Sequence, residues 1–248
     1  LGSSMLESQP HILVTGATRG IGAAILSSLS ARGARVVGHG TRPAPGILAA
    51  DLSASGAGDR LWAAALEALE GRIDVLVNNA GVFEAIPVEA PDDDWQASWS
   101  RTLQINLQAS ADLCRRMVLH AKGRAPEGAG LRGRIVNVAS RAAYRGDSPA
   151  HWHYAASKAG MVAMTKSIAR GYAGQGLLAF AICPGYVMTG MAEDYLASRG
   201  GDKLLADIPL GRVAQPDEVA SVATYLALDA PASMTGAVLD VNGASFVR

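Results

Sequence analysis

The fold is indicated by residues 11–22, which read His11-Ile12-Leu13-Val14-Thr15-Gly16-Ala17-Thr18-Arg19-Gly20-Ile21-Gly22. A short apolar run typical of a buried strand leads into three glycines, and residues 23–31 continue with apolar side chains at helical spacing. A helix that starts here directs free N–H groups and partial positive charge at the turn, which suits a pyrophosphate. Glycine lets the backbone approach phosphates closely because it has no Cβ. The segment therefore predicts a nucleotide-binding unit, although its spacing differs from the GxGxxG of many dinucleotide folds.

Six further apolar runs predict strands, and helical patterns separate them. The strands are expected at residues 34–38, 47–50, 73–77, 134–138, 177–182 and 237–241, and the helices at 61–69, 92–99, 103–119 and 216–228. This alternation favours an α/β fold, a Rossmann-type doubly wound parallel sheet of seven strands in three α/β/α layers. Since no internal repeat or linker is visible, residues 10–248 are expected to form a single dinucleotide-binding domain, and residues 1–9 to be a tag or disordered N-terminus.

The composition is that of an ordinary globular protein. Of the 248 residues 49% are hydrophobic, and 22 basic side chains balance 22 acidic ones. Without a positive excess, we expect no binding to nucleic acid or to an anionic membrane, and no apolar run reaches the ~20 residues of a membrane span. Cys114 and Cys183 are expected to be small buried side chains without a disulfide, which fits a cytoplasmic protein. We assign no metal ligands.

The end of the second predicted strand bears on the choice of nucleotide. In dinucleotide folds a carboxylate near this point binds the ribose 2′-OH of NAD, but no acidic residue lies between Val36 and Gly46. Gly40 leaves room there, and the forked donors of Arg42 and Arg19 suit a 2′-phosphate. Both arginines could instead be solvated surface residues. The sequence favours NADP(H) over NAD(H).

Polar residues also follow the third and fourth predicted strands. Asp51 could accept a hydrogen bond from an adenine amino group, or it could cap a helix or turn. Residues 78–81, Asn-Asn-Ala-Gly, predict a sharp turn at the carboxyl end of a strand, where ligands bind in open α/β sheets. Asn106 lies inside the helical pattern of residues 103–119, where asparagine is unfavourable. It is either a satisfied structural amide or the site of a kink that holds water.

The strongest candidate for chemistry is the pair Tyr154 and Lys158, four positions apart on a predicted helix. Residues at this spacing share one helix face, with Cβ atoms about 5–6 Å apart. The cation is expected to lower the phenol pKa from its ordinary value near ~10, so that the pair exchanges protons near neutrality. Chance spacing is the alternative. Ser140, at the tip of a predicted strand, is either a cap or a hydroxyl that bonds a reacting carbonyl beside Tyr154.

In their order along the chain, these motifs resemble those of the short-chain dehydrogenase/reductase family. The matching residues are Thr15-Gly16-Ala17-Thr18-Arg19-Gly20-Ile21-Gly22, Asn78-Asn79-Ala80-Gly81, Ser140, Tyr154, Lys158, Pro184-Gly185, Thr189 and Asn242-Gly243. Each motif alone is weak, but their common order is specific, and the resemblance extends from Pro10 to the end of the chain. The chain is most similar to the branch of about its own length that includes 3-oxoacyl-acyl-carrier-protein reductases.

The resemblance implies an NAD(P)-dependent oxidoreductase that transfers a hydride between nicotinamide and a secondary alcohol or ketone, as a carbonyl reductase does. It implies that Tyr154 is the general acid/base, that Lys158 lowers the tyrosine pKa and holds the nicotinamide ribose, and that Ser140 orients the carbonyl. Asn106 would keep a water that relays protons to Lys158. The implied cofactor contacts, beside Arg42, are Gly16, Arg19, Gly20, Ile21, Asp51, Leu52, Asn78, Ala80, Gly81, Tyr154, Lys158, Pro184, Gly185, Val187 and Thr189.

The resemblance further implies the strand order 3-2-1-4-5-6-7, a substrate lid over residues 188–208, and a homotetramer or homodimer packed through the helices that start near Ser100 and Tyr154. The gap from Ser140 to Tyr154 is one residue longer than is usual in the family, so Ser148 is a second candidate for the serine. The expected pocket, for a small alcohol or carbonyl compound, is lined by Arg141, Tyr144, His151, His153 and Tyr186. His153, which precedes Tyr154, could instead face solvent or pack against the protein.

The sequence allows two alternative functions. The first is a non-catalytic dinucleotide sensor or scaffold on the same fold, which the loss of Tyr154 or Lys158 would have favoured; both are present. The second is an epimerase or dehydratase of the longer relatives, against which the short C-terminal half and the glycine spacing speak. We therefore expect an enzyme that acts on CH–OH groups.

Overall fold

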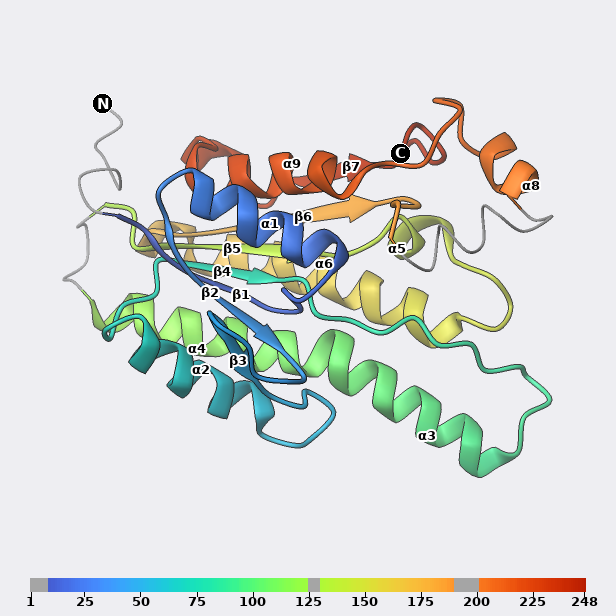
Figure 1. Cartoon of the computed structure of the whole chain (residues 1–248), viewed down its shortest axis with the longest axis horizontal. Coiled ribbons are helices and arrows are strands. Elements are labelled where there is room, and N and C mark those ends of the chain that lie inside the picture. Colours follow the sequence, from blue (N-terminus) through green and yellow to red (C-terminus); the bar gives the residue numbers. More distant parts are fainter. Residues whose placement is uncertain (1–8, 125–129, 190–200) are drawn as a thin grey trace.

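The computed structural model describes residues 9–124, 130–189 and 201–248, and within these ranges seven parallel strands form one sheet (Figure 1). The strands are β1 His11–Val14, β2 Arg35–Gly40, β3 Ile47–Ala49, β4 Val75–Asn78, β5 Gly133–Val138, β6 Leu177–Pro184 and β7 Val238–Val241. Their order across the sheet is β3-β2-β1-β4-β5-β6-β7, which confirms the predicted topology. The direction of winding reverses between β1 and β4, and open α/β sheets bind their ligands at such a point.

Helices cover both faces of the sheet (Figure 1). α1 Gly20–Ala31 and α9 Pro216–Leu228 lie on one face, and α2 Ala57–Ala68, α4 Ala109–Gly123 and α6 Trp152–Tyr172 lie on the other. The other helical segments are α3 Asp92–Leu103, η2 Gln104–Gln108, α5 Ala142–Arg145, η3 Ala173–Gln175, α8 Gly201–Ala206 and η4 Ala232–Met234. Among the helices described, none has both the length and the apolar character that crossing a membrane requires.

The alternation of side chains along the strands divides the core into two layers. On β1, Ile12 and Val14 belong to the layer that includes α1 and α9, whereas Leu13 between them packs in the layer of α2 and α4. Phe180 on β6 is fully buried in the first layer. Because both faces of the sheet are covered, the central strands are buried and mostly apolar, although β4 carries Asn78 and β5 carries Arg134 and Asn137.

Several elements differ from their predicted limits. α2 begins at Ala57 rather than at residue 61, because Gly56 turns the chain with a φ of 70°. The helical patterns predicted at 92–99 and 103–119 are joined, since α3 runs directly into η2, a π-helical turn around Asn106, and then into α4. The short helices α5 and α8 were not predicted, since four and six residues carry too little periodic pattern. Cys114 and Cys183 are buried free thiols, as expected.

Candidate active site

The glycine turn after β1 is fixed to the end of β4 by two polar side chains. The Thr15 hydroxyl accepts hydrogen bonds from the backbone N–H groups of Asn79 and Ala80, both at 3.0 Å. The Asn79 amide donates to the carbonyl oxygens of Thr15 at 3.1 Å and Gly16 at 3.0 Å. The two turns predicted from separate parts of the sequence therefore form one structure. Sequence reasoning assigned no role to the Asn79 side chain, although its place directly after a buried strand was an available signal.

The turn has no space for side chains at two of its glycines. A Cβ on Gly16, whose φ is +64°, would lie 2.8 Å from Ala80 Cα, and a Cβ on Gly22 would overlap the Gly16 carbonyl oxygen. α1 starts at Gly20 without a side-chain cap and without an acidic residue in its first turn. Its first N–H groups therefore have no competing carboxylate from the helix itself. A bare backbone turn at a helix N-terminus fits a dinucleotide pyrophosphate, which residues 16–21 would hold.

The end of β2 carries a buried histidine that the sequence did not single out. His39 Nδ1 accepts from the Gly16 N–H at 3.2 Å, so Nε2 carries the proton and donates to the Ala50 carbonyl at 3.0 Å. Burial lowers the pKa of His39, which keeps the ring neutral. Arg42 and Arg19 lie exposed near this end of the sheet, and neither forms an ion pair within the described part of the chain. Both predicted alternatives for these arginines, a phosphate contact and a solvated side chain, agree with that exposure.

The side chains of two predicted cofactor contacts have partners of their own. Asp51 Oδ1 accepts hydrogen bonds from Ser53, from its N–H at 2.9 Å and its hydroxyl at 2.7 Å, and these bonds lower the pKa of the exposed carboxyl. This is the turn-capping alternative. Asn78 is fully buried, and its amide donates to Asn137 Oδ1 at 2.9 Å. Contact with a nucleotide through the Asn78 side chain is therefore excluded, because this residue of β4 directs its amide into the core. Only its backbone remains for such a role. Leu52, the next residue after Asp51, is buried.

Ser140 and Tyr154 meet at the carboxyl end of β5. Ser140 lies beside the Tyr154 phenol and acts to lower its pKa, and the Ser140 hydroxyl oxygen accepts a hydrogen bond from the Ala142 N–H at 3.1 Å. Ser148, the other candidate, is exposed, and its hydroxyl lies 2.6 Å from His151 Nδ1. The structure therefore pairs Ser140 with the tyrosine, despite the longer gap between them.

Lys158 lies one helical turn beyond Tyr154 on α6, as the spacing predicted. Its Nζ is 5.8 Å from the centre of the Tyr154 ring and donates to the Val138 carbonyl at 2.9 Å. Burial lowers the pKa of Lys158 to about 8. Burial also raises the pKa of Tyr154 to about 12, against the opposing effect of Ser140. The expectation that Lys158 depresses the phenol pKa is wrong for this arrangement, because the burial of both groups outweighs an ammonium that is directed at a carbonyl.

Asn106 lies in the π-helical turn η2, so the predicted kink is present. Its Oδ1 accepts from the Val82 N–H at 2.8 Å, and its amide donates to the Val82 carbonyl at 3.0 Å and to Ser157 Oγ at 3.2 Å. The side chain is thus a satisfied structural amide as well. A Cβ on Gly81 would lie 3.3 Å from Asn106 Oδ1 and 3.5 Å from Lys158 Nζ, so the glycine keeps these groups close together.

Aromatic rings stand beside Tyr154. Phe83 stacks on His151 with a centroid separation of 3.9 Å and an angle of 4°, and it meets the Tyr154 ring edge-on at 4.7 Å. Phe83 is 45% exposed, and sequence reasoning missed it. The guanidinium of Arg141 lies 4.4 Å from the centre of the Tyr186 ring. Three predicted pocket residues, His151, Arg141 and Tyr186, therefore lie near the tyrosine and the strand ends.

The other two predicted pocket residues are placed differently. His153 is fully buried, and its Nε2 lies 3.1 Å from Ser98 Oγ on α3. The prediction that it lines the substrate pocket is wrong, because neighbouring residues on a helix point about 100° apart and His153 packs between α3 and α6. Tyr144 is covered by the C-terminal residues: its ring stacks on Phe246 with centroids 6.1 Å apart, and its hydroxyl accepts from Arg248 at 3.0 Å.

Residues 185–189 follow β6 and reach the glycine turn. A Cβ on Gly185 would lie 2.8 Å from Asn242 Cβ, which explains why a glycine stands opposite that residue. Val187 forms an isolated parallel bridge with Ala214. Thr189 lies against the turn, since a Cβ on Gly20 would be 3.1 Å from its methyl group. Residues 190–200 of the predicted lid lie outside the described residues.

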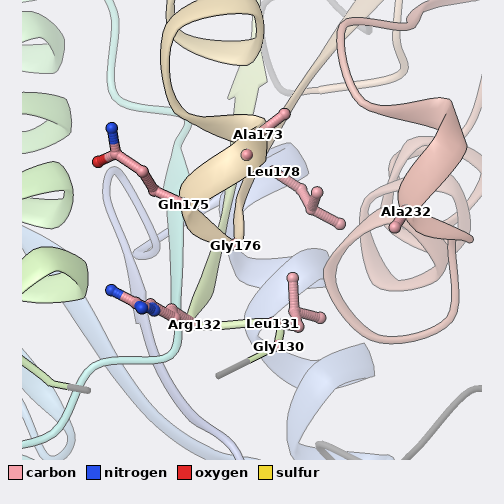
Figure 2. Close-up of a pocket in the computed structure, with 9 residues that line it drawn as sticks. Gly130, Leu131, Arg132, Ala173, Gln175, Gly176, Leu178 and Ala232 are labelled. Carbon is pink, nitrogen blue, oxygen red and sulfur yellow. The ribbon is translucent and has the colours of Figure 1, made fainter. Parts of the chain in front are cut away.

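A cavity of about 360 Å³ lies elsewhere on the molecule (Figure 2). It is found at the amino ends of β5 and β6, whereas the predicted site residues gather at the carboxyl ends. Its lining residues are Gly130, Leu131, Arg132, Ala173, Gly174, Gln175, Gly176, Leu178 and Ala232. None of these is a predicted site residue.

Known proteins share both the sequence pattern and the fold. Residues 16–244 match the family model described as enoyl-(acyl carrier protein) reductase. The chain is 37% identical to D-threitol dehydrogenase of Mycolicibacterium smegmatis, over 95% of this chain and 92% of that protein. It is 33% identical to the 3-oxoacyl-acyl-carrier-protein reductase FabG of Escherichia coli, over 95% and 96%.

Solved structures agree with this assignment. The crystal structure of the TT0495 protein from Thermus thermophilus superposes with a TM-score of 0.84 at 30% identity, over 95% of this chain and 98% of that one. The fold, the order of the motifs and the relatives all point to the same family. The chain is a member of the short-chain dehydrogenase/reductase family, in the FabG-like branch of NAD(P)-dependent dehydrogenases and reductases.

Proposed function

We propose that this protein transfers a hydride between NADP(H) and a small secondary alcohol or ketone, with Tyr154, Lys158, Ser140 and Asn106 as its proton relay. The observation that carries the proposal is that Ser140, Tyr154 and Lys158 meet at the carboxyl end of the sheet: Ser140 acts on the pKa of the Tyr154 phenol, and Lys158 Nζ lies 5.8 Å from the centre of the Tyr154 ring. The relatives are named as dehydrogenases and reductases, so the alternative of a non-catalytic sensor gains no support.

In carbonyl reduction the Tyr154 phenol donates its proton to the substrate oxygen. A phenol whose pKa is raised to about 12 is fully protonated at neutral pH, so it is ready to act as the acid. Ser140, beside the phenol, donates a second hydrogen bond to the same oxygen as negative charge develops there. In alcohol oxidation the same groups take the proton away.

Lys158 returns a proton to Tyr154 after each turnover. Its pKa of about 8 means that the ammonium releases and regains a proton near neutral pH. Since both protons of the Asn106 amide are used, the proposed relay water is held by the Asn106 backbone carbonyl rather than by the side chain. Bound nicotinamide supplies or accepts the hydride. Gly81 leaves the space beside Lys158 open to the nicotinamide ribose.

The preference for NADP(H) rests on charge at the adenosine end of the turn. Arg42 and Arg19 are exposed, and neither has an ion-pair partner in the residues described. No acidic residue between Val36 and Gly46 would repel a 2′-phosphate. The proposed contacts at the other end are residues 184–189, and residues 188–208 are proposed as a substrate lid.

We also propose a cytoplasmic homotetramer or homodimer that packs through α3 and α6. Trp95 on α3 and Trp152 on α6 are in edge contact at 5.6 Å, and Trp152 is 51% exposed. Exposed aromatic side chains of this kind are enriched in protein interfaces.

The test is a screen of ketones and alcohols followed at the nicotinamide absorbance, repeated with Tyr154→Phe. We expect this variant to lose turnover by about 10²–10⁴-fold, the usual range for a general acid/base, while NADPH affinity stays within about threefold. Tyr172→Phe on the same helix is the matched control and should retain full activity. Equal turnover by Tyr154→Phe and the native protein would refute the assigned acid/base.

A further inference from the structure

Arg141 lies at the centre of an unbalanced charge cluster beside the proposed acid/base. It directly follows Ser140, and its N–H donates to the Pro184 carbonyl at 2.9 Å, which fixes it between the ends of β5 and β6. Its side chain is only 9% exposed, and the guanidinium lies on the Tyr186 ring. A buried guanidinium on the residue that directly follows Ser140 requires an explanation.

The carboxylate nearest to Arg141 is shared with a second arginine. Asp207 Oδ2 accepts from Arg145 Nη1 at 2.7 Å and from Arg141 Nη1 at 3.4 Å. Among the residues that the structure describes, Asp207 is the one carboxylate within ion-pair distance of Arg141. Two positive charges thus share one negative charge, and the shorter bond belongs to Arg145. The cluster of Arg141, Arg145 and Asp207 therefore has a net charge of +1. Because Arg141 has the longer bond to Asp207, the uncompensated positive charge lies mostly on Arg141.

A buried guanidinium is stable only when its N–H donors find acceptors. The Arg141 guanidinium has one long hydrogen bond, to Asp207, and lies against the face of the Tyr186 ring. Other N–H donors of the guanidinium are therefore available to bind a ligand. A carboxylate matches the planar fork of a guanidinium with two parallel hydrogen bonds. The Asp207 carboxylate is itself 45% exposed, so water screens its hold on Arg141.

We propose that Arg141 is a specificity-determining residue that binds a carboxylate group of the substrate. The substrate is thus a hydroxy acid or oxo acid, with its reacting carbon held near Ser140 and Tyr154 while its carboxylate meets Arg141. Asp207 acts as an internal competitor that occupies part of the charge cluster until the substrate arrives. This inference rests on the proposed function for the chemistry, but the anion site itself is testable without turnover.

The first experiment measures binding by titration calorimetry, with and without NADP⁺. The probes are carboxylates from acetate to hexanoate and the matching neutral amides. We expect the native protein to bind the best carboxylate at least about tenfold more tightly than its amide, as a charge-assisted hydrogen-bonded pair requires. Arg141→Gln should abolish this difference, and Arg141→Lys should keep part of it because the charge remains without the fork.

Asp207→Asn gives an opposite and more specific expectation. Removing the competing carboxylate should strengthen carboxylate binding about three- to tenfold, since both guanidinium groups then face the ligand. Arg32→Gln is the matched control, because Arg32 also pairs with an aspartate, Asp229, at a distant surface. Arg32→Gln should change neither the affinity for the carboxylate nor the affinity for its amide.

The second experiment compares 4-oxopentanoate with 4-oxopentanamide as substrates. Arg141→Gln should lower kcat/KM for the acid about 10–100-fold and change that for the amide less than about threefold. A thermal melt of each variant separates loss of folding from loss of recognition. If Arg141→Gln lowers kcat/KM for the acid and for the amide by the same factor, Arg141 is a structural residue and the proposal is overturned.

The outcomes separate this inference from the proposed function. The anion site is overturned if the native protein binds carboxylates no more tightly than their amides, both with and without NADP⁺. This holds even if the protein reduces ketones. Carboxylate binding that depends on Arg141, in a protein that transfers no hydride, supports the site and refutes the proposed function.

Discussion

The burial of Lys158 leads to a stability prediction that is independent of catalysis. A lysine whose pKa falls from 10.5 to about 8 on folding destabilises the native state while it is protonated. Because each unit of pKa is worth about 1.4 kcal/mol, the native state loses about 3 kcal/mol at pH 7 relative to a neutral side chain. Methionine has nearly the same length and no charge, so Lys158→Met removes this cost.

The substitution also removes one hydrogen bond. Lys158 Nζ donates to the Val138 carbonyl, and a buried carbonyl left without that partner costs about 1–2 kcal/mol. The net expectation is that Lys158→Met is about 1–2 kcal/mol more stable than the native protein at pH 7. The proposed carbonyl reductase activity should nevertheless fall by at least about 100-fold, because the substitution cuts the proposed proton relay.

The dependence on pH identifies the cause. The folded pKa is depressed, so the unfolded chain binds more protons between pH 8 and 10.5, and the stability contribution of Lys158 rises with pH in that window. The advantage of Lys158→Met should therefore shrink by about 2 kcal/mol between pH 7 and pH 9.5. Titrations of Tyr154 and the cysteines are common to both proteins and largely cancel in the difference.

The assay is urea unfolding of both proteins at the two pH values, without cofactor. Lys166→Met, an exposed lysine on the same helix, is the matched control and should change stability by less than about 0.5 kcal/mol at either pH. The reasoning fails if Lys158→Met is less stable than the native protein at pH 7, or if the difference between the two does not depend on pH.

Two further predictions concern the nucleotide end of the site. Arg42→Ala should weaken NADPH binding about tenfold and leave NADH binding unchanged, and fluorescence titration of both nucleotides measures this; a clear NADH preference in the native protein would overturn the argument. Asn79→Ala removes two hydrogen bonds to the Thr15 and Gly16 carbonyls, so it should lower the free energy of unfolding in urea by about 2 kcal/mol. It should also weaken the binding of NADPH and of NADH by the same factor. A stable Asn79→Ala variant with normal nucleotide affinity would show that the turn holds its shape without this clamp.

Features that depend on local pattern were predictable from the sequence. The strand, glycine turn and helix of residues 11–31 follow from apolar spacing and from the positions of glycine, and the structure confirms them. The four-residue spacing of Tyr154 and Lys158 places both on one face of α6 for the same reason. The strand order was available only through the resemblance to a known family, since periodicity alone does not say which strands are neighbours.

The placement of individual side chains was decided by contacts between distant segments. His153 was expected in the pocket because it precedes Tyr154, but the packing of α3 against α6 buries it. Phe83 was overlooked, because its position between His151 and Tyr154 depends on two loops about seventy residues apart in the chain. The link between Asp207 and Arg141 likewise joins segments that the sequence does not relate.

The sequence by itself determined the family and the order of elements along the chain, and it singled out the residues proposed to carry the chemistry, because all of these depend on local spacing. Only the tertiary structure decided the electrostatic state of the pair on α6. From spacing alone we predicted a lowered pKa for the Tyr154 phenol. In the structure, burial raises the pKa of Tyr154 to about 12 and lowers that of Lys158 to about 8. The reason is that the charge on a group depends on the water removed around it, and that water is removed by residues from the whole chain.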